Sequence, residues 1–322
     1  MADHTMKRWS KRVAWLVALG LLGWLIMRTD LSRVFEQLRQ VSWAWLVALV
    51  FMQSVTIVLV SIQWKLLSVH MRLSVPLRDV FVMNMGGTFI ESITPAVKIG
   101  GEVYKVYHLH REVGLAKKVA VGLVAVQKMV SLLGFIVLLW VVLVTVIVTG
   151  LMPDTSWLWL GFWVTISVLI IIGWVLLIAW RWHHRSENQT VTPFQTALLS
   201  MRTRLWMGWI HGALSITIWS LYGLKTTLIL FAILGEWSFV TAFTATLLAY
   251  TVGMLPISPG GLGTYEATFV SVFETFGVTA ESGLAVVVLL RLVTFWFSLW
   301  ISLMTVAVVY TKRKPNKVVN AK

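Results

Sequence analysis

Two basic residues, Lys128 and Arg291, lie inside segments that are otherwise apolar. A charge within a hydrocarbon layer costs several kcal/mol unless it is paired or hydrated, so such residues often mark an ion or substrate path. Arg291 lies seven residues beyond Leu284, where its apolar segment starts, which is about 10 Å along a helix. We predict that both cations meet an anionic group such as a phosphate. For a third cation, Lys225, we expect the amine to reach the membrane surface along its own aliphatic chain.

Proline and glycine interrupt two further apolar stretches, Asp79 to His110 and Phe239 to Gly277. Helices that break at membrane depth offer free N–H groups and the positive end of a helix dipole to an anionic substrate group. We expect such helix ends at Gly100–Gly101 and at Gly260–Gly261. The full set of predicted substrate-binding or lipid-binding residues is Pro95, Gly100, Gly101, Tyr104, Lys105, Lys128, Pro256, Pro259, Gly260, Gly261, Tyr265, Glu266 and Arg291.

Carboxylates occur in the same interrupted stretches and suit either ion pairing or proton transfer. For Glu91 and Glu274 the sequence favours structural pairing with a cation such as Arg291 or Lys128. For Glu266, which directly follows Tyr265, pairing and a part in transport both remain open.

A basic cluster follows the first break and comprises Lys98, Lys105, His108, His110 and Arg111. Cations at a membrane surface attract anionic lipid head groups by about 1 kcal/mol each. The general enrichment of lysine and arginine in cytoplasmic loops explains the cluster equally well.

Motifs of common enzyme classes are absent from the sequence. It contains no H-E-x-x-H, no G-x-S-x-G and no Walker A motif, which removes the usual signatures of zinc proteases, serine hydrolases and P-loop proteins. The chain also has no cysteine. We therefore predict no catalytic residues, no metal site and no cofactor.

The elements that position these residues follow from composition. Hydrophobic residues make up 58% of the 322 residues and charged residues 12%, and backbone polar groups in lipid must be satisfied within helices or closed barrels. Uninterrupted apolar runs near the 20 or so residues that span a bilayer favour helices. We predict an all-α integral membrane fold with about six transmembrane helices. They are expected at Val13 to Met27, Val41 to Ile62, Val119 to Thr149, Trp157 to Trp180, Leu205 to Ile233 and Leu284 to Tyr310.

Each interrupted stretch is interpreted as a re-entrant hairpin that leaves the membrane on the side it entered. The hairpins share an ordered pattern, in which Pro95, Gly100, Gly101, Tyr104, Gly114 and Lys128 correspond to Pro256, Gly260, Gly261, Tyr265, Gly277 and Arg291. With three spans per half, the second copy must be inserted upside down, which is an inverted repeat. A chance similarity of glycine and proline breaks is the alternative. The domain prediction is a single transmembrane domain over 1–322 with pseudo-repeats at about 13–150 and 157–310.

The net charge of +14 is explained by membrane topology, and no nucleic-acid partner is expected. Lysine and arginine concentrate before the first span, between Lys65 and Lys118, between Arg181 and Arg204, and after Thr311. The positive-inside rule then places both termini, including basic tails at 1–12 and 311–322, in the cytoplasm. The N-terminus resembles a secretory signal but lacks an A-x-A-like cleavage site, so we interpret it as an uncleaved span.

Two motifs resemble a known family. They are the segment Pro95-Ala-Val-Lys-Ile-Gly-Gly-Glu-Val-Tyr-Lys and the later Leu255-Pro-Ile-Ser-Pro-Gly-Gly-Leu-Gly-Thr-Tyr-Glu, which is followed by Leu290-Arg291. They are similar to the lysylphosphatidylglycerol synthase transmembrane-region family, also described as flippase-like, over about Val41 to Tyr310. The resemblance implies a protein like the membrane half of the multiple peptide resistance factor, which flips lysylphosphatidylglycerol outward and so weakens cationic antimicrobial peptides.

The expected function is therefore translocation of a phospholipid or a lipid-linked glycan between leaflets of a bacterial cytoplasmic membrane. Anionic or lipid-linked head groups would be the partners. The alternative is a phosphatidylglycerol lysyltransferase-family protein, or an accessory subunit of a separate synthase or glycosyltransferase. Against the enzyme, the chain ends twelve residues after Tyr310, where the related factor carries an acyltransferase-like domain. A scaffold without transport is a third alternative, and the sequence leaves the oligomeric state open.

Overall fold

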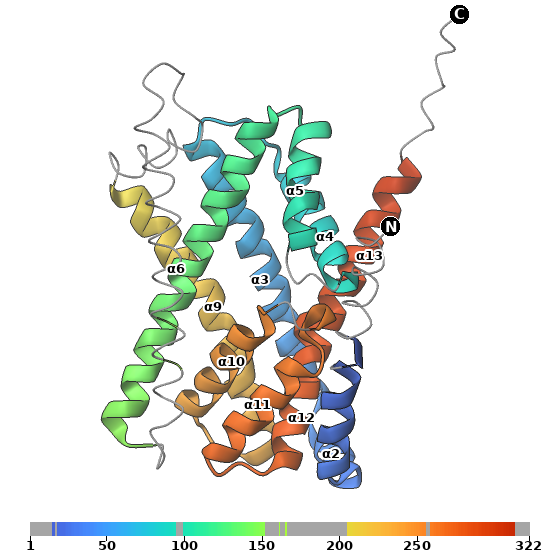
Figure 1. The fold of residues 1–322 in the computed structure, drawn as a ribbon, viewed down its shortest axis with the longest axis vertical. Coiled ribbons are helices and arrows are strands. Elements are labelled where there is room, and N and C mark those ends of the chain that lie inside the picture. The colour runs from blue at the N-terminus through green and yellow to red at the C-terminus, as the bar shows by residue number, and fades with distance from the viewer. Residues whose placement is uncertain are drawn as a thin grey trace, which may run out of the picture.

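The computed structural model of the protein describes residues 15–16, 18–94, 99–151, 161, 165, 205–255 and 258–312. Within these ranges the secondary structure is helical (Figure 1). A short apolar helix spans Ala18–Arg28. It is followed by α2 (Leu31–Gln40), α3 (Trp43–His70), α4 (Leu77–Ile93), α5 (Ile99–Arg111), α6 (Lys117–Thr149), α9 (Leu205–Leu234), α10 (Phe239–Gly253), the 3-10 turn η1 (Pro259–Gly261), α11 (Thr264–Thr275), α12 (Ala280–Arg291), the π-helical turn η2 (Leu292–Trp296) and α13 (Phe297–Lys312).

Four helices of the described chain are long and apolar enough to cross a membrane: Trp43–His70, Lys117–Thr149, Gly208–Leu234 and Ala280–Val309. The last one runs through α12, η2 and α13. They confirm four of the predicted spans, because long apolar runs without proline or charge clusters favour a helix that satisfies its own backbone groups.

The two remaining predicted spans have different outcomes. For the first, at Val13 to Met27, the described part includes the apolar helix Ala18–Arg28, and Val13, Ala14 and Val17 lie outside the described residues. Its apolar run is interrupted on both sides by charged residues, Lys11 and Arg12 before it and Arg28 after it. The predicted span at Trp157 to Trp180 lies outside the described residues apart from Gly161 and Thr165.

Both interrupted stretches form helix–break–helix hairpins. Hairpin 1 consists of α4 and α5, and hairpin 2 consists of α10, η1 and α11. In each hairpin the two arms pack against each other. The hairpins lie toward opposite ends of the bundle, with α4 and α5 at the top of Figure 1 and α10 and α11 at the bottom. Their tips approach in the interior, since the break at Gly260 faces the carbonyl oxygen of Ser92.

The packing of the helices supports the predicted inverted repeat. Each element of the first half can be paired with one of the second: α3 with α9, hairpin 1 with hairpin 2, and α6 with the helix Ala280–Val309. Pairs of elements that pack together then correspond to other pairs that also pack together. The matched pairs are α4·α5 with α10·α11, α5·α6 with α11·α12, α4·α13 with α10·α6, α3·α4 with α9·α10, and α3·α6 with α9·α12. The turns after the hairpins also match, because Gly114 and Gly277 have φ values of 81° and 79°.

Each hairpin has its own hydrophobic core. Around hairpin 1, Trp64, Met83, Leu109 and Leu123 are buried together. Around hairpin 2, the corresponding core includes Phe269 and Phe273 of α11 together with residues of α2, α10 and α12. The hairpin arms are therefore held by packing on crossing helices, which a broken segment at membrane depth requires.

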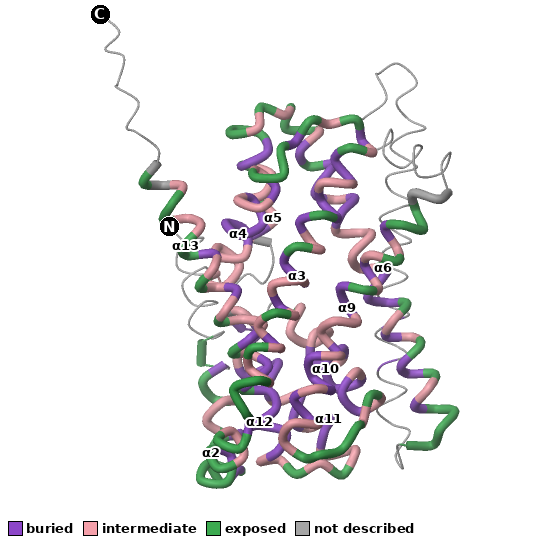
Figure 2. The backbone as a smooth tube through the Cα atoms, turned by 180° about the vertical axis from the view of Figure 1, so that it is seen from behind, coloured by how far each residue is buried: buried purple, intermediate pink, exposed green. Residues whose placement is uncertain are grey.

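The outward face of the bundle is apolar. Along α6, exposed and buried residues alternate, as Figure 2 shows. The exposed residues on this helix include Leu133, Val137, Val141, Val144 and Ile147. An exposed apolar stripe along a 33-residue helix is typical of a surface that faces lipid rather than water.

Candidate functional site

A polar cavity of about 310 Å³ lies between the tips of the two hairpins. Its wall comes from both halves of the chain: α3, α4, α5 and α6 on one side, and α9, α10, η1, α11 and the helix Ala280–Val309 on the other. This size lies within the range of small-ligand sites, about 300–1,000 Å³. Lys105, Lys128, Tyr265 and Arg291, which were predicted from the sequence, all line this cavity, as do Gly260 and Gly261.

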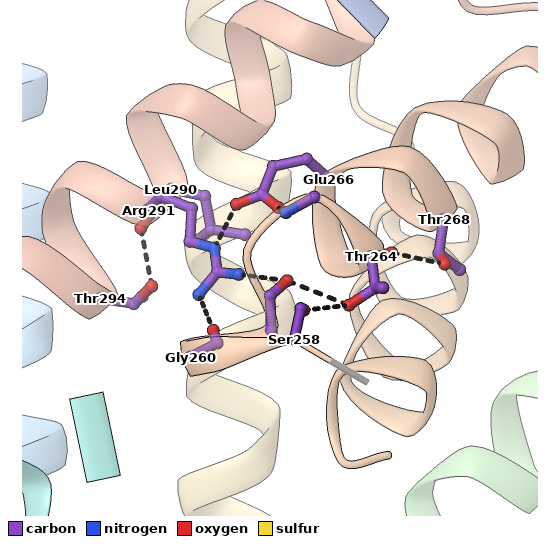
Figure 3. A network of polar contacts seen from close by, with 10 residues as sticks. Ser258, Gly260, Thr264, Glu266, Thr268, Leu290, Arg291 and Thr294 are labelled. Carbon is purple, nitrogen blue, oxygen red and sulfur yellow. Dashed lines mark hydrogen bonds and ion pairs between the residues drawn. The ribbon is translucent and has the colours of Figure 1, made fainter. Parts of the chain in front are cut away.

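Arg291 holds the break of hairpin 2 together (Figure 3). Its Nε donates to Glu266 Oε1 at 2.7 Å, and its two terminal nitrogens donate to the carbonyl oxygens of Gly260 and Gly261 at 3.1 Å each. The guanidinium also lies over the rings of Tyr265 and Phe295, at 4.4 and 5.2 Å from their centroids. Arg291 therefore satisfies carbonyl groups that the broken helix leaves without intrahelical partners.

Glu266 has a second partner inside the hairpin. Its Oε2 accepts a 2.7 Å hydrogen bond from the backbone N–H of Gly263, the residue that precedes α11. The side chain thus caps its own helix while it pairs with Arg291. The sequence left open whether Glu266 forms an ion pair or takes part in transport. In the structure it pairs with Arg291 and caps α11.

Hairpin 1 contains a related ion pair. Glu102 Oε1 accepts from Lys105 Nζ at 3.2 Å and from Lys128 Nζ at 3.3 Å. Lys105 also lies over the ring of Trp64, with 5.4 Å between its nitrogen and the ring centroid. In both hairpins, a carboxylate on the second arm is bound by a cation of the following crossing helix, 26 residues later for Glu102 and 25 for Glu266.

Several buried polar atoms at the cavity have no hydrogen-bond partner among the residues that the structure describes. They are Asn84 Nδ2, Glu102 Oε2 and the hydroxyl of Tyr265. Asn84 and Tyr265 are each 4% exposed, so these atoms are largely withdrawn from bulk water. Because unsatisfied buried polar groups are costly, such a cluster is typical of a place where a ligand completes the hydrogen bonding.

The rest of the wall combines amides and aromatic rings. Amide side chains come from Gln53, Gln63 and Gln127, and the aromatic rings come from Trp64, Trp219, Tyr222, Tyr250, Tyr265 and Phe295. A wall with donors, acceptors and ring faces suits a polar group that carries hydroxyls or a phosphate more than a hydrocarbon chain.

The structure also gives the positions of several of the remaining predicted site residues. Gly100, Gly101 and Tyr104 belong to α5, the second arm of hairpin 1, and Gly100 and Gly101 form its first turn together with Ile99. Pro95 and Pro256 lie outside the described residues, and for Pro259 only the backbone, in η1, is described. Gly260 and Gly261 have φ values of 59° and 69°, which explains glycine at this turn.

The other two carboxylates of the prediction behave differently. Glu274 forms an ion pair with Arg28 at 3.0 Å, so its structural pairing is confirmed, although with another partner than expected. Glu91 lines the cavity, and no ion pair is found for it among the described residues.

Within the basic cluster, Lys105 lines the cavity and His108 is only 5% exposed. The expectation for Lys225 is wrong, because this side chain does not reach the membrane surface. It is fully buried, and its amine donates to Gln53 Oε1 and to Thr56 Oγ1. These internal acceptors replace the water that a surface position would supply.

Glu102 is the principal site residue that the sequence analysis missed. The signal was present, because a carboxylate directly follows Gly100–Gly101 and precedes Lys128 by nearly the spacing that separates Glu266 from Arg291. Gln53 and Asn84 gave no comparable signal, since single amides in apolar segments are common.

Comparison with known proteins gives concordant results. The model of the family described as "Lysylphosphatidylglycerol synthase TM region" matches residues 13–302. Among curated proteins, a "UPF0104 membrane protein" of Methanothermobacter thermautotrophicus is 22% identical, with 91% of this chain and 94% of the relative covered. A second UPF0104 membrane protein, of Methanocaldococcus jannaschii, is also 22% identical, with 88% and 89% covered. The apolar crossing helices and this match show that the chain is a multi-pass membrane protein that belongs to the lysylphosphatidylglycerol synthase TM region family.

Proposed function

We propose that this protein translocates a lipid between the leaflets of the membrane and that the cavity between the hairpin tips binds the lipid head group. The observation that carries the proposal is the cavity itself: a polar space of about 310 Å³, set within an apolar bundle and walled by both hairpins. A head group crossing the hydrocarbon layer needs such a compartment, because an unpaired polar group in lipid costs several kcal/mol.

The charges of the wall support an anionic or zwitterionic head group. Lys128 has a half-exposed side chain, 36% accessible, and shares Glu102 with Lys105. An ammonium that shares one carboxylate retains donors for a phosphate oxygen. Arg291 uses three of its five N–H donors within hairpin 2, so it shapes the cavity and also keeps donors for a phosphate. Lysylphosphatidylglycerol, other phospholipids and lipid-linked glycans all present a phosphate beside further polar groups.

Alternating access would follow from the repeat. The two hairpins enter from opposite ends and meet at their tips, so rocking one repeat against the other would open the cavity to one leaflet at a time. The end that carries Arg72, Arg78, Arg111, Lys117 and Lys118 would face the cytoplasm, and the end with Glu236 and Glu281 would face outward.

Translocation is tested in proteoliposomes. Purified protein is reconstituted with phosphatidylglycerol, lysylphosphatidylglycerol or phosphatidylethanolamine carrying a fluorescent acyl chain, and a membrane-impermeant reagent reports the lipid reachable from outside. We expect faster exchange between leaflets for at least one of these three phosphate-bearing lipids. If folded protein accelerates none of them, the proposal is wrong.

A matched pair of variants links the activity to the cavity. Lys128→Gln removes a cation from the wall and should lower the rate of exchange at least tenfold. Lys118→Gln removes an exposed cation from the first turn of the same helix, α6, and should leave the rate unchanged. Equal rates for the two variants would show that the head group does not bind at the cavity.

A further inference from the structure

A buried cation lies directly behind the cavity wall and has no acidic partner. Lys225 of α9 is 0% exposed. Its Nζ donates to Gln53 Oε1 and, at 3.3 Å, to Thr56 Oγ1, and it lies 4.2 Å from the ring centroid of Tyr222. Within the described part of the chain, no carboxylate lies at ion-pair distance from this amine. Lys105, Lys128 and Arg291 each have one.

The inverted repeat contains a neutral counterpart of this contact. Gln63 of α3 donates to Ser215 of α9 at 2.7 Å, and Gln53 of α3 meets Lys225 of α9. Ser215 follows Gln53 by 162 residues, and Lys225 follows Gln63 by the same number. This offset is close to the one that relates Gly100 to Gly260 and Tyr104 to Tyr265 in the repeat. An amide and a hydroxyl are thus sufficient to join α3 to α9 at one crossing. Packing does not explain a charge at the other.

Lys225 does not bind the head group directly. Gln53, Thr56 and Tyr222 line the cavity, whereas Lys225 lies behind them. From α3 it is faced by the neutral groups of Gln53 and Thr56. The ionisable groups that line the cavity are Glu91, Glu102, Lys105, Lys128, Tyr222, Tyr250, Tyr265 and Arg291. Arg291 is already bound to Glu266. A buried ammonium with neutral acceptors is poorly stabilised, and an amine can lose its charge by releasing one proton.

The same contact joins the two repeats. While Gln53 accepts from Lys225 of α9, its Nε2 donates to Ser298 of α13 at 2.8 Å. Gln53 belongs to the first repeat, and Lys225 and Ser298 belong to the second. A neutral amine accepts a hydrogen bond as readily as it donates one. Loss of the proton therefore permits Gln53 to turn its amide and to release Ser298.

We propose that Lys225 is a proton-binding site that couples lipid translocation to a transmembrane proton gradient. The proposal rests on the proposed function. In each cycle the ammonium releases one proton to solvent in the cavity when the cavity faces one side, and the amine takes up one proton when the cavity faces the other. The charged form without a head group ties the repeats together through Gln53. An anionic head group in the cavity lets the charged form rock with its proton, and the neutral form rocks back with the cavity empty, so one proton crosses with each lipid.

The test measures the distribution of a fluorescent phospholipid between leaflets of proteoliposomes with and without an imposed pH gradient. With one proton per lipid, a gradient of one pH unit shifts the steady-state ratio by up to about tenfold. Lys225→Gln, which reproduces the neutral contact of the other crossing, should exchange lipid to an equal distribution with or without the gradient. Lys225→Arg should also ignore the gradient, because a guanidinium keeps its charge.

Lys65→Gln is the matched control. Lys65 lies on α3 and donates to the carbonyl oxygen of Val75 at 2.7 Å, away from the cavity, so this variant should keep the wild-type response to the gradient. Folding of each variant is checked by thermal melting in detergent. If Lys225→Gln does not fold, Lys225→Arg and the wild-type measurement of proton uptake with a pH-sensitive dye decide the question.

The possible outcomes are distinct. A wild-type protein that exchanges lipid but ignores the gradient overturns the coupling while the proposed function stands. A gradient response that persists in Lys225→Gln also overturns it. A folded wild-type protein that exchanges no lipid under any condition overturns the proposed function and the coupling with it. A gradient response that is lost in both Lys225 variants and kept in Lys65→Gln supports the assignment.

Discussion

At the scale of single residues, the guanidinium of Arg291 binds one carboxylate and two backbone carbonyls of hairpin 2. Three donors in a fixed plane match this arrangement, and a lysine ammonium at the end of a flexible chain cannot reach all three acceptors in the same way. The position thus requires the shape of arginine as well as its charge.

Arg291→Lys should therefore destabilise the protein. Each lost hydrogen bond to a charged group is expected to cost about 1.5–3 kcal/mol. The carbonyl of Gly260 loses the donor from Arg291, whereas that of Gly261 keeps the hydroxyl of Thr264. Thermal melting in detergent checks this. Arg28→Lys is the control, because the Arg28 side chain is 46% exposed in its pair with Glu274 and such pairs contribute at most about 1 kcal/mol. Equal melting temperatures of the two variants would contradict the proposed role of Arg291.

The sequence predicted that Arg291 matters but not how it acts. A charge in an apolar run can be recognised from the sequence alone. The carbonyls that Arg291 binds, however, come from a turn about 30 residues away, and the backbone path of this turn depends on the φ angles of Gly260 and Gly261. Gln53 and Asn84 escaped prediction for the same reason, since only the folded arrangement brings their amides to the cavity wall.

At the scale of elements, hairpin 1 depends on a close approach of its two arms. A Cβ atom built on Gly101 of α5 would lie 2.8 Å from the carbonyl oxygen of Gly87 on α4. A backbone atom within a helix cannot move aside without shifting the whole arm. Glycine at 101 is therefore explained by packing.

Gly101→Ala should separate the arms and cost about 1–3 kcal/mol, the usual range for an overpacked interior. Gly208→Ala is the matched control, because Gly208 is also helical and has no atom within 4 Å of its ideal Cβ position. It should be neutral or stabilising by up to about 1 kcal/mol. The comparison uses melting temperature and protease sensitivity. A Gly101→Ala protein as stable as the control would show that the arms have room to adapt.

The long crossing helices were the easiest elements to predict, since their apolar runs exceed the membrane thickness. The hairpins were predicted from proline and glycine breaks, and their arms are observed at Leu77–Ile93, Ile99–Arg111, Phe239–Gly253 and Thr264–Thr275. The first span, predicted at Val13 to Met27, stays a prediction, because Val13, Ala14 and Val17 lie outside the described residues.

At the scale of the whole molecule, the two ends of the bundle differ in charge, and the inverted repeat requires the hairpins to enter from opposite sides. The orientation and the repeat boundaries are proposals that a labelling experiment can test. The chain has no cysteine, so single cysteines can be introduced without removing native ones.

Arg111→Cys, at the end of α5, and Glu236→Cys, between α9 and α10, both replace exposed residues. In right-side-out vesicles, an impermeant maleimide should label the cysteine at 236 at once and the cysteine at 111 only after the membrane is opened. Labelling of both from the same side would contradict the inverted arrangement, and a reversed pattern would contradict only the orientation.

The packing of α4 on α13 has a consequence for biogenesis. Ser302 Oγ meets Met85 Sδ at 3.7 Å across 217 residues of chain, so the neighbour that completes the first hairpin is synthesised long after α4. Until then α4 must keep Asn84 and Glu91 in the membrane without their final surroundings. The cavity therefore closes only after α13 has been synthesised, and its assembly is a late step in the folding of the chain.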